Sequence, residues 1–170
     1  SETKILQRTY WDGLHDQLEH LAGPISGNRT AQAQNWMNYP VGRTGFTLGT
    51  AMHIWDKWIR VELYISGQQA KAYFDQLLVQ KDEIEAKLGE PLNWDRMDDL
   101  PDDTRTDVRI SLKLEGADPG DRDEWDAQHA WLAGKLNKFH SVFAPRVRAL
   151  LPYIKGNIAL VFTNDNICAV

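Results

Sequence analysis

Cysteine is almost absent from this chain, since Cys168 is the only one among 170 residues. A single cysteine cannot form an internal disulfide, and this scarcity is typical of reducing compartments, so we expect a cytoplasmic protein. Long hydrophobic runs are missing too, and we expect no membrane partner. Basic residues are outnumbered, with 19 Lys and Arg against 24 Asp and Glu. This balance argues against a surface that binds nucleic-acid backbone everywhere, but it leaves room for a local basic patch.

The rest of the composition is that of a folded chain, with 42% hydrophobic and 25% charged residues and no internal repeat. Its length suits one domain with a sizeable core. We expect residues 1–151 to form that domain. We expect residues 152–170 to form a C-terminal tail or an additional strand, because 157–163 is an apolar run typical of a strand.

Three segments carry apolar residues at helical spacing, which predicts helices over 4–21, 68–88 and 125–143. Pro145 is expected to kink or end the last of these. Strand-like runs occupy 46–55, 58–65, 92–97 and 108–114. This order is not the regular alternation of a doubly wound sheet. We therefore expect an α+β fold, with a mainly antiparallel sheet around a central hairpin and about three helices covering one face.

The hairpin predicted over 46–65 has two faces of different character. With Asp56-Lys57 as its turn, paired residues have numbers that sum to 113. One face is then apolar and suited to a core, with the pairs Ile54–Ile59, Met52–Val61, Thr50–Leu63 and Leu48–Ile65. The other face is mostly polar and aromatic, with the pairs Trp55–Trp58, His53–Arg60, Ala51–Glu62 and Gly49–Tyr64.

The polar hairpin face is the best candidate for a binding site. An arginine there would bind phosphate or carboxylate, a glutamate would accept a base amino group or orient the arginine, and an aromatic ring would stack on a ligand ring. The turn that contains Arg43 would add an anion contact. The binding candidates are Arg43, His53, Trp55, Trp58, Arg60, Glu62 and Tyr64. Cross-strand charge pairs and aromatic pairs beneath a helix are common in sheets, so a structural role is the simpler interpretation of the hairpin residues, and the binding site is the best functional one.

No catalytic residue, metal ligand or cofactor is assigned. A restriction-type nuclease binds Mg²⁺ through an Asp and, on the next strand, a Glu or Asp one residue away from a Lys. Asp56 precedes Glu62 here, but Tyr64 occupies the position where that Lys is needed. His129 and His140 are too far apart on one helix to bind a single metal ion without other ligands.

Four ordered motifs together resemble a known prokaryotic family. They are Trp36…Tyr39-Pro-Val-Gly-Arg-Thr-Gly-Phe46, Ile59-Arg-Val-Glu-Leu-Tyr-Ile65, Ala70-Lys-Ala-Tyr-Phe-Asp-Gln-Leu-Leu78 and Trp125…Gln128-His-Ala-Trp-Leu132. With them, the chain from the first helix to Leu151 is similar to domain of unknown function 4268. Domains of that family often follow a restriction-endonuclease-like nuclease domain. The resemblance therefore implies an accessory role in DNA metabolism or in defence against foreign DNA.

Three hypotheses follow for the function. The first is a noncatalytic accessory or recognition domain whose polar hairpin face and Arg43 bind nucleic acid or a nuclease partner. The second is a metal-dependent phosphodiesterase that uses Glu62 and loop carboxylates. The third is a structural dimerisation domain with exposed aromatic residues at its contact surface, which makes a homo-oligomer an expected alternative. The first requires that Arg60, Glu62 and Tyr64 are not all buried beneath a helix.

Overall fold

The computed structural model describes residues 1–99, 106–153, 160–163 and 166–169. Its helices are α1 (Glu2–Leu21), α2 (Ala70–Leu78), α3 (Lys81–Leu88) and α4 (Trp125–Ala149), with a short 3₁₀ turn, η1 (Arg122–Glu124), before α4. Its strands are β1 (Trp36–Pro40), β2 (Phe46–His53), β3 (Trp58–Ile65), β4 (Asn93–Asp95), β5 (Val108–Glu115), β6 (Leu160–Thr163) and β7 (Asn166–Ala169).

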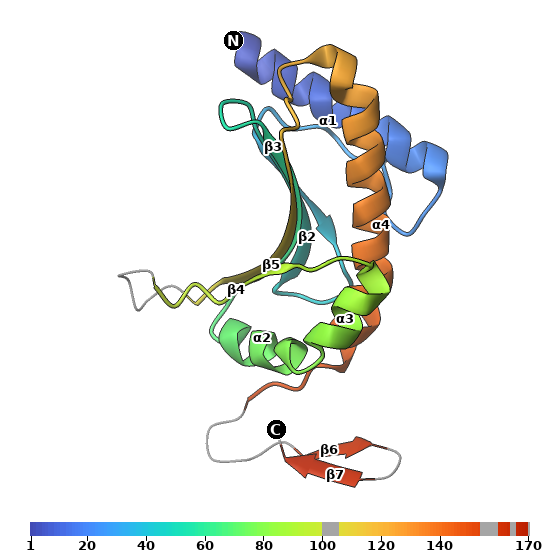
Figure 1. Cartoon of the computed structure of the whole chain (residues 1–170). Coiled ribbons are helices and arrows are strands. Elements are labelled where there is room, and N and C mark those ends of the chain that lie inside the picture. The colour runs from blue at the N-terminus through green and yellow to red at the C-terminus, as the bar shows by residue number, and fades with distance from the viewer. Residues whose placement is uncertain (100–105, 154–159, 164–165, 170) are drawn as a thin grey trace.

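Five strands form one antiparallel sheet in the order β1-β2-β3-β5-β4. The four helices lie on one side of this sheet, and the sheet curves so that its other face is concave and uncovered by helices (Figure 1). The predicted α+β fold with a mainly antiparallel sheet and a central hairpin is confirmed, and so is the prediction that helices cover one face.

The core lies between the sheet and the helices. Alternate residues of β2 and β3 point into it, and Leu48, Ile59 and Leu63 have no exposed surface. Trp11 of α1 and Phe139 of α4 are fully buried against the same layer. Burial of one large apolar side chain contributes about 1.5–3 kcal/mol, so this layer supplies much of the drive for folding.

The hairpin register differs from the prediction by two residues. Paired residues of β2 and β3 have numbers that sum to 111, as in His53 with Trp58 and Gly49 with Glu62. A four-residue turn, 54–57, replaces the two-residue turn, and Lys57 takes a left-handed conformation with φ of 54°. The predicted partners were therefore wrong. The predicted faces were right, because a shift by two residues leaves every side chain on its own side of the sheet.

The helices also depart from two predictions. The segment expected as one helix over 68–88 is divided into α2 and α3, because the backbone of Gln80 leaves helical geometry at φ −96° and ψ 12°. This break raises the helix number from about three to four. Helix α4 continues through Pro145 to Ala149, so of the two outcomes expected at this proline, a kink or an end, the end does not occur. The turn around Pro145 is supported by Arg146, whose Nη1 donates to Val142 O at 2.8 Å.

Two glutamines of the α2 region hold the chain that leaves α4. Gln76 exchanges two hydrogen bonds with the backbone of Leu151, at 2.7 and 3.0 Å. Gln69 makes the same exchange with Tyr153, at 2.7 and 2.8 Å. We call these four bonds the glutamine clasp. Each side-chain amide acts here as a peptide group would in a strand.

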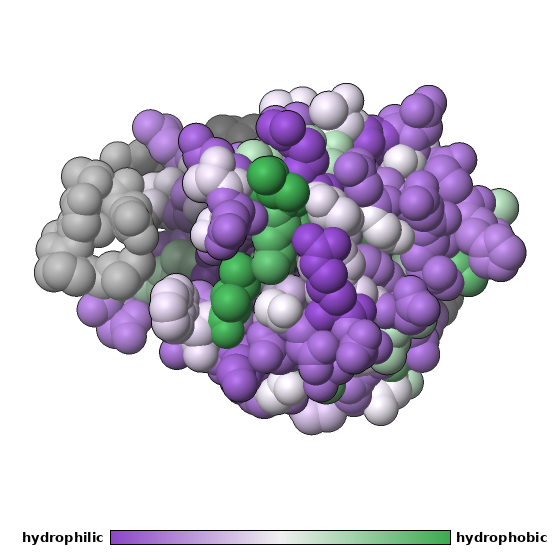
Figure 2. All heavy atoms as spheres, turned by 90° about the horizontal axis from the view of Figure 1, so that it is seen from above, coloured by the Kyte–Doolittle hydropathy of each residue, from purple (hydrophilic) through white to green (hydrophobic). Residues whose placement is uncertain are grey.

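Beyond the clasp, β6 and β7 pair with each other in a separate two-stranded sheet. Residues 154–159, 164–165 and 170 of the predicted tail lie outside the described residues. Among the helices that the structure describes, none combines the length and apolarity needed to span a membrane. Seen from above in Figure 2, the surface is mostly hydrophilic and is crossed by a narrow band of hydrophobic residues.

Candidate functional site

The uncovered face of the sheet, which we call the open face, brings polar and aromatic side chains of several strands together. Strand alternation places Trp58, Arg60, Glu62 and Tyr64 of β3 on this face. The neighbouring strand β5 adds Arg109, Ser111, Lys113 and Glu115, and β1 adds Trp36 and Asn38. Within the part of the chain that the structure describes, no helix lies over these residues (Figure 1).

Two cations stand directly opposite each other on the open face. Arg60 of β3 is paired with Lys113 of β5 in the sheet register. Like charges in directly opposed positions destabilise a sheet. Each cation has an acid two residues away on its own strand: Arg60 Nε lies 3.5 Å from Glu62, and Lys113 Nζ lies 3.6 Å from Glu115. The direct cross-strand position nevertheless holds a second positive charge instead of an acid.

Glu62 is the buried centre of the open face, with 7% of its surface exposed. Its carboxylate forms ion pairs with both Arg60 and Arg109. The residue opposite it on β2 is Gly49, and a Cβ atom built there would lie 3.0 Å from Glu62 Cγ. The missing side chain at Gly49 therefore provides the space in which Glu62 lies between its two arginines.

Aromatic rings support the cations. The ring of His53 stacks on that of Trp58, with centroids 5.2 Å apart and planes 23° apart. Arg60 Cζ and Lys113 Nζ lie 5.0 and 4.6 Å from the centre of the same Trp58 ring. A cation held over an aromatic face gains electrostatic attraction. Trp58 thus orients both members of the opposed cation pair.

The surroundings on the open face shift the pKa values of two of its groups. Burial lowers the pKa of the Arg60 guanidinium, Glu62 opposes this shift, and the positive charge of Arg109 adds to it. Burial and the hydrogen bond from its hydroxyl to Asp107 raise the pKa of Tyr64 to about 12. Tyr64 is therefore a neutral hydrogen-bonding group at physiological pH, and a bound anion would favour the charged form of Arg60.

Five of the seven predicted binding residues meet on this face: His53, Trp58, Arg60, Glu62 and Tyr64. Arg60 and Tyr64 are partly exposed, and Glu62 is buried by its neighbours on the same face. Trp55 does not join them as a cross-strand partner of Trp58. It lies in the 54–57 turn with 90% of its surface exposed.

Arg43 lies apart from the other six residues. Its Nη1 donates to the carbonyl oxygens of Val147 and Leu150 at 2.9 and 2.7 Å, and its Nη2 donates to Tyr73 Oη at 3.0 Å. The two carbonyls belong to the C-terminal end of α4, where helix carbonyls lack intrahelical partners. The guanidinium therefore joins the β1–β2 turn to the end of α4.

The sequence-based prediction missed Arg109, Lys113 and Trp36. A signal was present for the first two, because Arg109, Ser111 and Lys113 alternate with apolar residues along β5. Alternation alone does not identify the neighbouring strand. Only the pairing of β3 with β5 places these cations beside Arg60 and Glu62.

The chemistry that the open face offers is noncovalent. Within the described residues, no three His, Cys, Asp or Glu side chains are grouped so as to hold a metal ion. Guanidinium and ammonium groups bind phosphate and carboxylate oxygens, and the aromatic and amide side chains beside them bind flat polar rings. The arrangement suits recognition of an anionic ligand.

One comparison with known proteins finds a match. The model of a family described as domain of unknown function (DUF4268) matches residues 6–147, which runs from α1 to the last turns of α4. No curated protein and no solved structure matches the chain. The matched range contains the whole five-stranded sheet and the open face.

Proposed function

We propose that this chain, which belongs to the family described as domain of unknown function (DUF4268), is a noncatalytic recognition domain whose open face binds nucleic acid. The proposal places the domain in prokaryotic DNA metabolism or defence, where it serves a nuclease domain as an accessory. Binding, rather than cleavage, is the task that this face supports best.

The observation that carries the proposal is the opposed pair Arg60 and Lys113. A phosphate between the two side chains would relieve their mutual repulsion. It would also offset part of the free-energy cost of burying the charged Arg60 guanidinium. Both cations are already oriented by Trp58, so little side-chain freedom is lost on binding. The orientation of both cations by one ring in the free protein supports the proposed phosphate binding.

The surroundings favour a single strand. Trp36, with 45% of its surface exposed, is separated from Arg60 by only Ala51 in one row across the sheet. A strand whose phosphate lies at the cation pair can stack a base on this ring, and base–aromatic stacking contributes about 1–3 kcal/mol for each base. Sheet faces that bind single-stranded RNA use the same division between charged and aromatic side chains.

The test is a salt titration of oligonucleotide binding. Fluorescence anisotropy of labelled single-stranded and double-stranded 20-mers would be measured for the unaltered protein and for the double variant Arg60→Gln/Lys113→Gln. The log–log salt slope of single-strand binding is expected to fall by about 0.7 in the double variant, which corresponds to the one phosphate that the cation pair neutralises. Lys4→Gln, an exposed change on α1 across the sheet from this face, should leave the slope unchanged.

Equal affinity and equal salt slope for the unaltered protein and the double variant would contradict the proposal. A tighter complex with the duplex would contradict the single-strand preference alone. Circular dichroism of each variant would verify that the fold is retained.

A further inference from the structure

The outer edge of β1 is a second recognition element, which borders the open face at Trp36 and Asn38. Strand β1 is at one end of the sheet order and pairs only with β2. Met52 N donates to Asn35 O at 2.9 Å, and bonded and nonbonded pairs alternate along an antiparallel ladder. The backbone N–H and C=O groups of Trp36 and Asn38 consequently point away from β2. Among the described residues, no hydrogen bond is made to these four groups.

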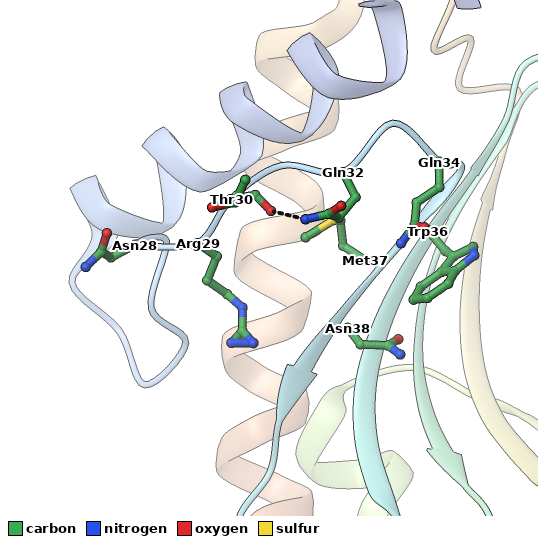
Figure 3. A pocket seen from close by; sticks show the side chains of 8 residues that line it. All are labelled: Asn28, Arg29, Thr30, Gln32, Gln34, Trp36, Met37 and Asn38. Atoms are coloured by element: carbon green, nitrogen blue, oxygen red, sulfur yellow. Dashed lines mark hydrogen bonds between the residues drawn. The ribbon is translucent and has the colours of Figure 1, made fainter. Parts of the chain in front are cut away.

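A groove accompanies this edge. A cavity of about 650 Å³ is lined by four side-chain amides together with Arg29 and Trp36 (Figure 3); the amides belong to Asn28, Gln32, Gln34 and Asn38. A second cavity of about 540 Å³ continues past Asn38 toward Thr47 and shares Arg29 and Asn38 with the first. Together the two cavities follow the full length of β1.

The wall opposite β1 is held in place by the helices. Trp11 Nε1 of α1 donates to Gln34 O at 2.8 Å, and Glu19 of the same helix accepts from Gly27 N at 2.7 Å. Asn137 of α4 accepts from Ile25 N at 3.2 Å. These three bonds fix the connection between α1 and β1 at both ends, so the groove exists before any ligand arrives.

Arg29 supplies the charge of the groove. Its guanidinium lies 5.5 Å from the centre of the Tyr39 ring, and within the described part of the chain it forms no ion pair with a carboxylate. Figure 3 shows its side chain extending from the α1–β1 connection into the space beside β1. A carboxylate in this space would complete a charge-assisted hydrogen bond with Arg29.

We propose that the β1 edge binds an extended peptide segment that carries an acidic residue. The peptide adds to the sheet as a sixth strand through the backbone groups of Trp36 and Asn38, and its carboxylate pairs with Arg29. Main-chain bonds supply affinity in such strand addition, and pockets for alternate side chains supply specificity. This site does not depend on nucleic-acid binding at the open face.

A second copy of the chain suits the edge less well than an acidic peptide. Two β1 strands paired about Asn38 would bring two Arg29 guanidinium groups to the same place without a carboxylate between them. An acidic peptide removes this repulsion and provides the missing counter-ion. Edge-to-edge dimerisation through β1 would therefore contradict the proposal.

The test uses a proline that blocks only the outer edge. Asn38→Pro removes an N–H that points away from β2, and β1 already contains Pro40 at an equivalent outward position. Asn38→Ala is the matched control, because it removes the same side chain and keeps the N–H. A displayed library of random eight-residue peptides is selected on the immobilised protein, and the affinity of the selected peptides is measured for each variant.

Selected peptides are expected to contain an Asp or Glu and to bind Asn38→Pro at least about tenfold more weakly than Asn38→Ala. Arg29→Gln should lower the affinity for acidic peptides, and this variant should bind them no more tightly than their Asn or Gln counterparts. Arg60→Gln, on the open face, should leave peptide binding unchanged even if it abolishes binding of the labelled oligonucleotide, so the two proposals fail independently.

Three results would overturn the inference. The first is a library that yields no peptide above background, and the second is a set of peptides that bind Asn38→Pro and Asn38→Ala equally. The third is a concentration-dependent dimer of the unaltered protein, seen by sedimentation, that Asn38→Pro converts to a monomer. Urea unfolding of Asn38→Pro and Arg29→Gln shows that each variant is folded. If Asn38→Pro does not fold, the Arg29→Gln measurement decides the question.

Discussion

At the scale of single residues, the buried carboxylate of Glu62 has two roles. It neutralises Arg60 and Arg109, and it occupies the space above Gly49. Removal of one member of a buried ion network leaves uncompensated charge in a place that water reaches poorly. The stability of this face therefore depends on one side chain.

We expect Glu62→Gln to lower the free energy of unfolding by about 3 kcal/mol, because Arg60 and Arg109 lose their shared counter-ion. Urea denaturation followed by tryptophan fluorescence measures this loss. Glu115→Gln removes an exposed acid from the same face and should change the free energy by less than about 0.5 kcal/mol. Similar losses in both variants would contradict a special role for Glu62.

Arg43 is expected to stabilise the fold without contributing to ligand binding. Arg43→Ala leaves Leu150 O without its donor and leaves Val147 O with only its bond from Leu150 N, and it should cost about 1–3 kcal/mol. Arg43→Lys should recover only part of this, because an ammonium group lacks the planar fork. Oligonucleotide affinity, measured under conditions where each variant is folded, should stay constant. If a variant were as stable as the unaltered protein but bound the oligonucleotide more weakly, Arg43 would have to be counted among the binding residues.

At the scale of elements, the hairpin shows what periodicity predicts and what it leaves open. The apolar positions from Leu48 to Leu63 identify the buried face, since strand side chains alternate whatever the pairing. The register depends on the turn, where Lys57 adopts a left-handed conformation. Lysine rarely takes this conformation, so the sequence does not indicate it. Arg43 illustrates the same limit, because the two carbonyls that it binds lie more than a hundred residues later in the chain.

The turn itself offers a direct test of this register. Lys57→Gly should raise the free energy of unfolding by about 1 kcal/mol, because glycine takes a positive φ without the steric cost that lysine bears. Asp56→Gly, one position earlier and without a positive φ, should bring no gain. Thermal unfolding of the two variants side by side measures the difference. A gain at Asp56 instead of Lys57 would indicate a different turn.

Two buried histidines, His15 of α1 and His129 of α4, should make the stability depend on pH. His15 and His129 are 4% and 5% exposed, and burial lowers the pKa of each. Between the lowered pKa and the ordinary value near 6.5, the unfolded chain binds more protons than the folded one. The free energy of unfolding therefore has its full value above about pH 6.5 and decreases as the pH falls below that value.

Urea unfolding at pH 7.5, 6.5 and 5.5 measures this decrease. The double variant His15→Gln/His129→Gln should show a flatter dependence across the same interval. His20→Gln, an exposed change in the last turn of α1, should keep the dependence of the unaltered chain. A free energy of unfolding that rises toward pH 5.5 would contradict the assignment.

At the scale of the whole molecule, residues 1–151 remain the predicted domain, and the glutamine clasp gives a way to test that limit. A chain that ends after Tyr153 keeps both reciprocal pairs and should match the full chain to within about 0.5 kcal/mol. A chain that ends after Leu150 loses all four bonds and should be less stable by about 2–4 kcal/mol. Differential scanning calorimetry of the three chains distinguishes these cases. Equal stability of all three would show that the clasp contributes nothing.

The clasp also turns a stretch of irregular backbone into a slow-exchanging one. The N–H groups of Leu151 and Tyr153 belong to no helix or strand, yet each donates to a glutamine oxygen. Their deuterium uptake should be slower than that of ordinary connecting segments, because the clasp must open before exchange occurs. The exchange rate of these two amides therefore reports how often α2 separates from the end of α4. It can be measured without following the amides of the sheet.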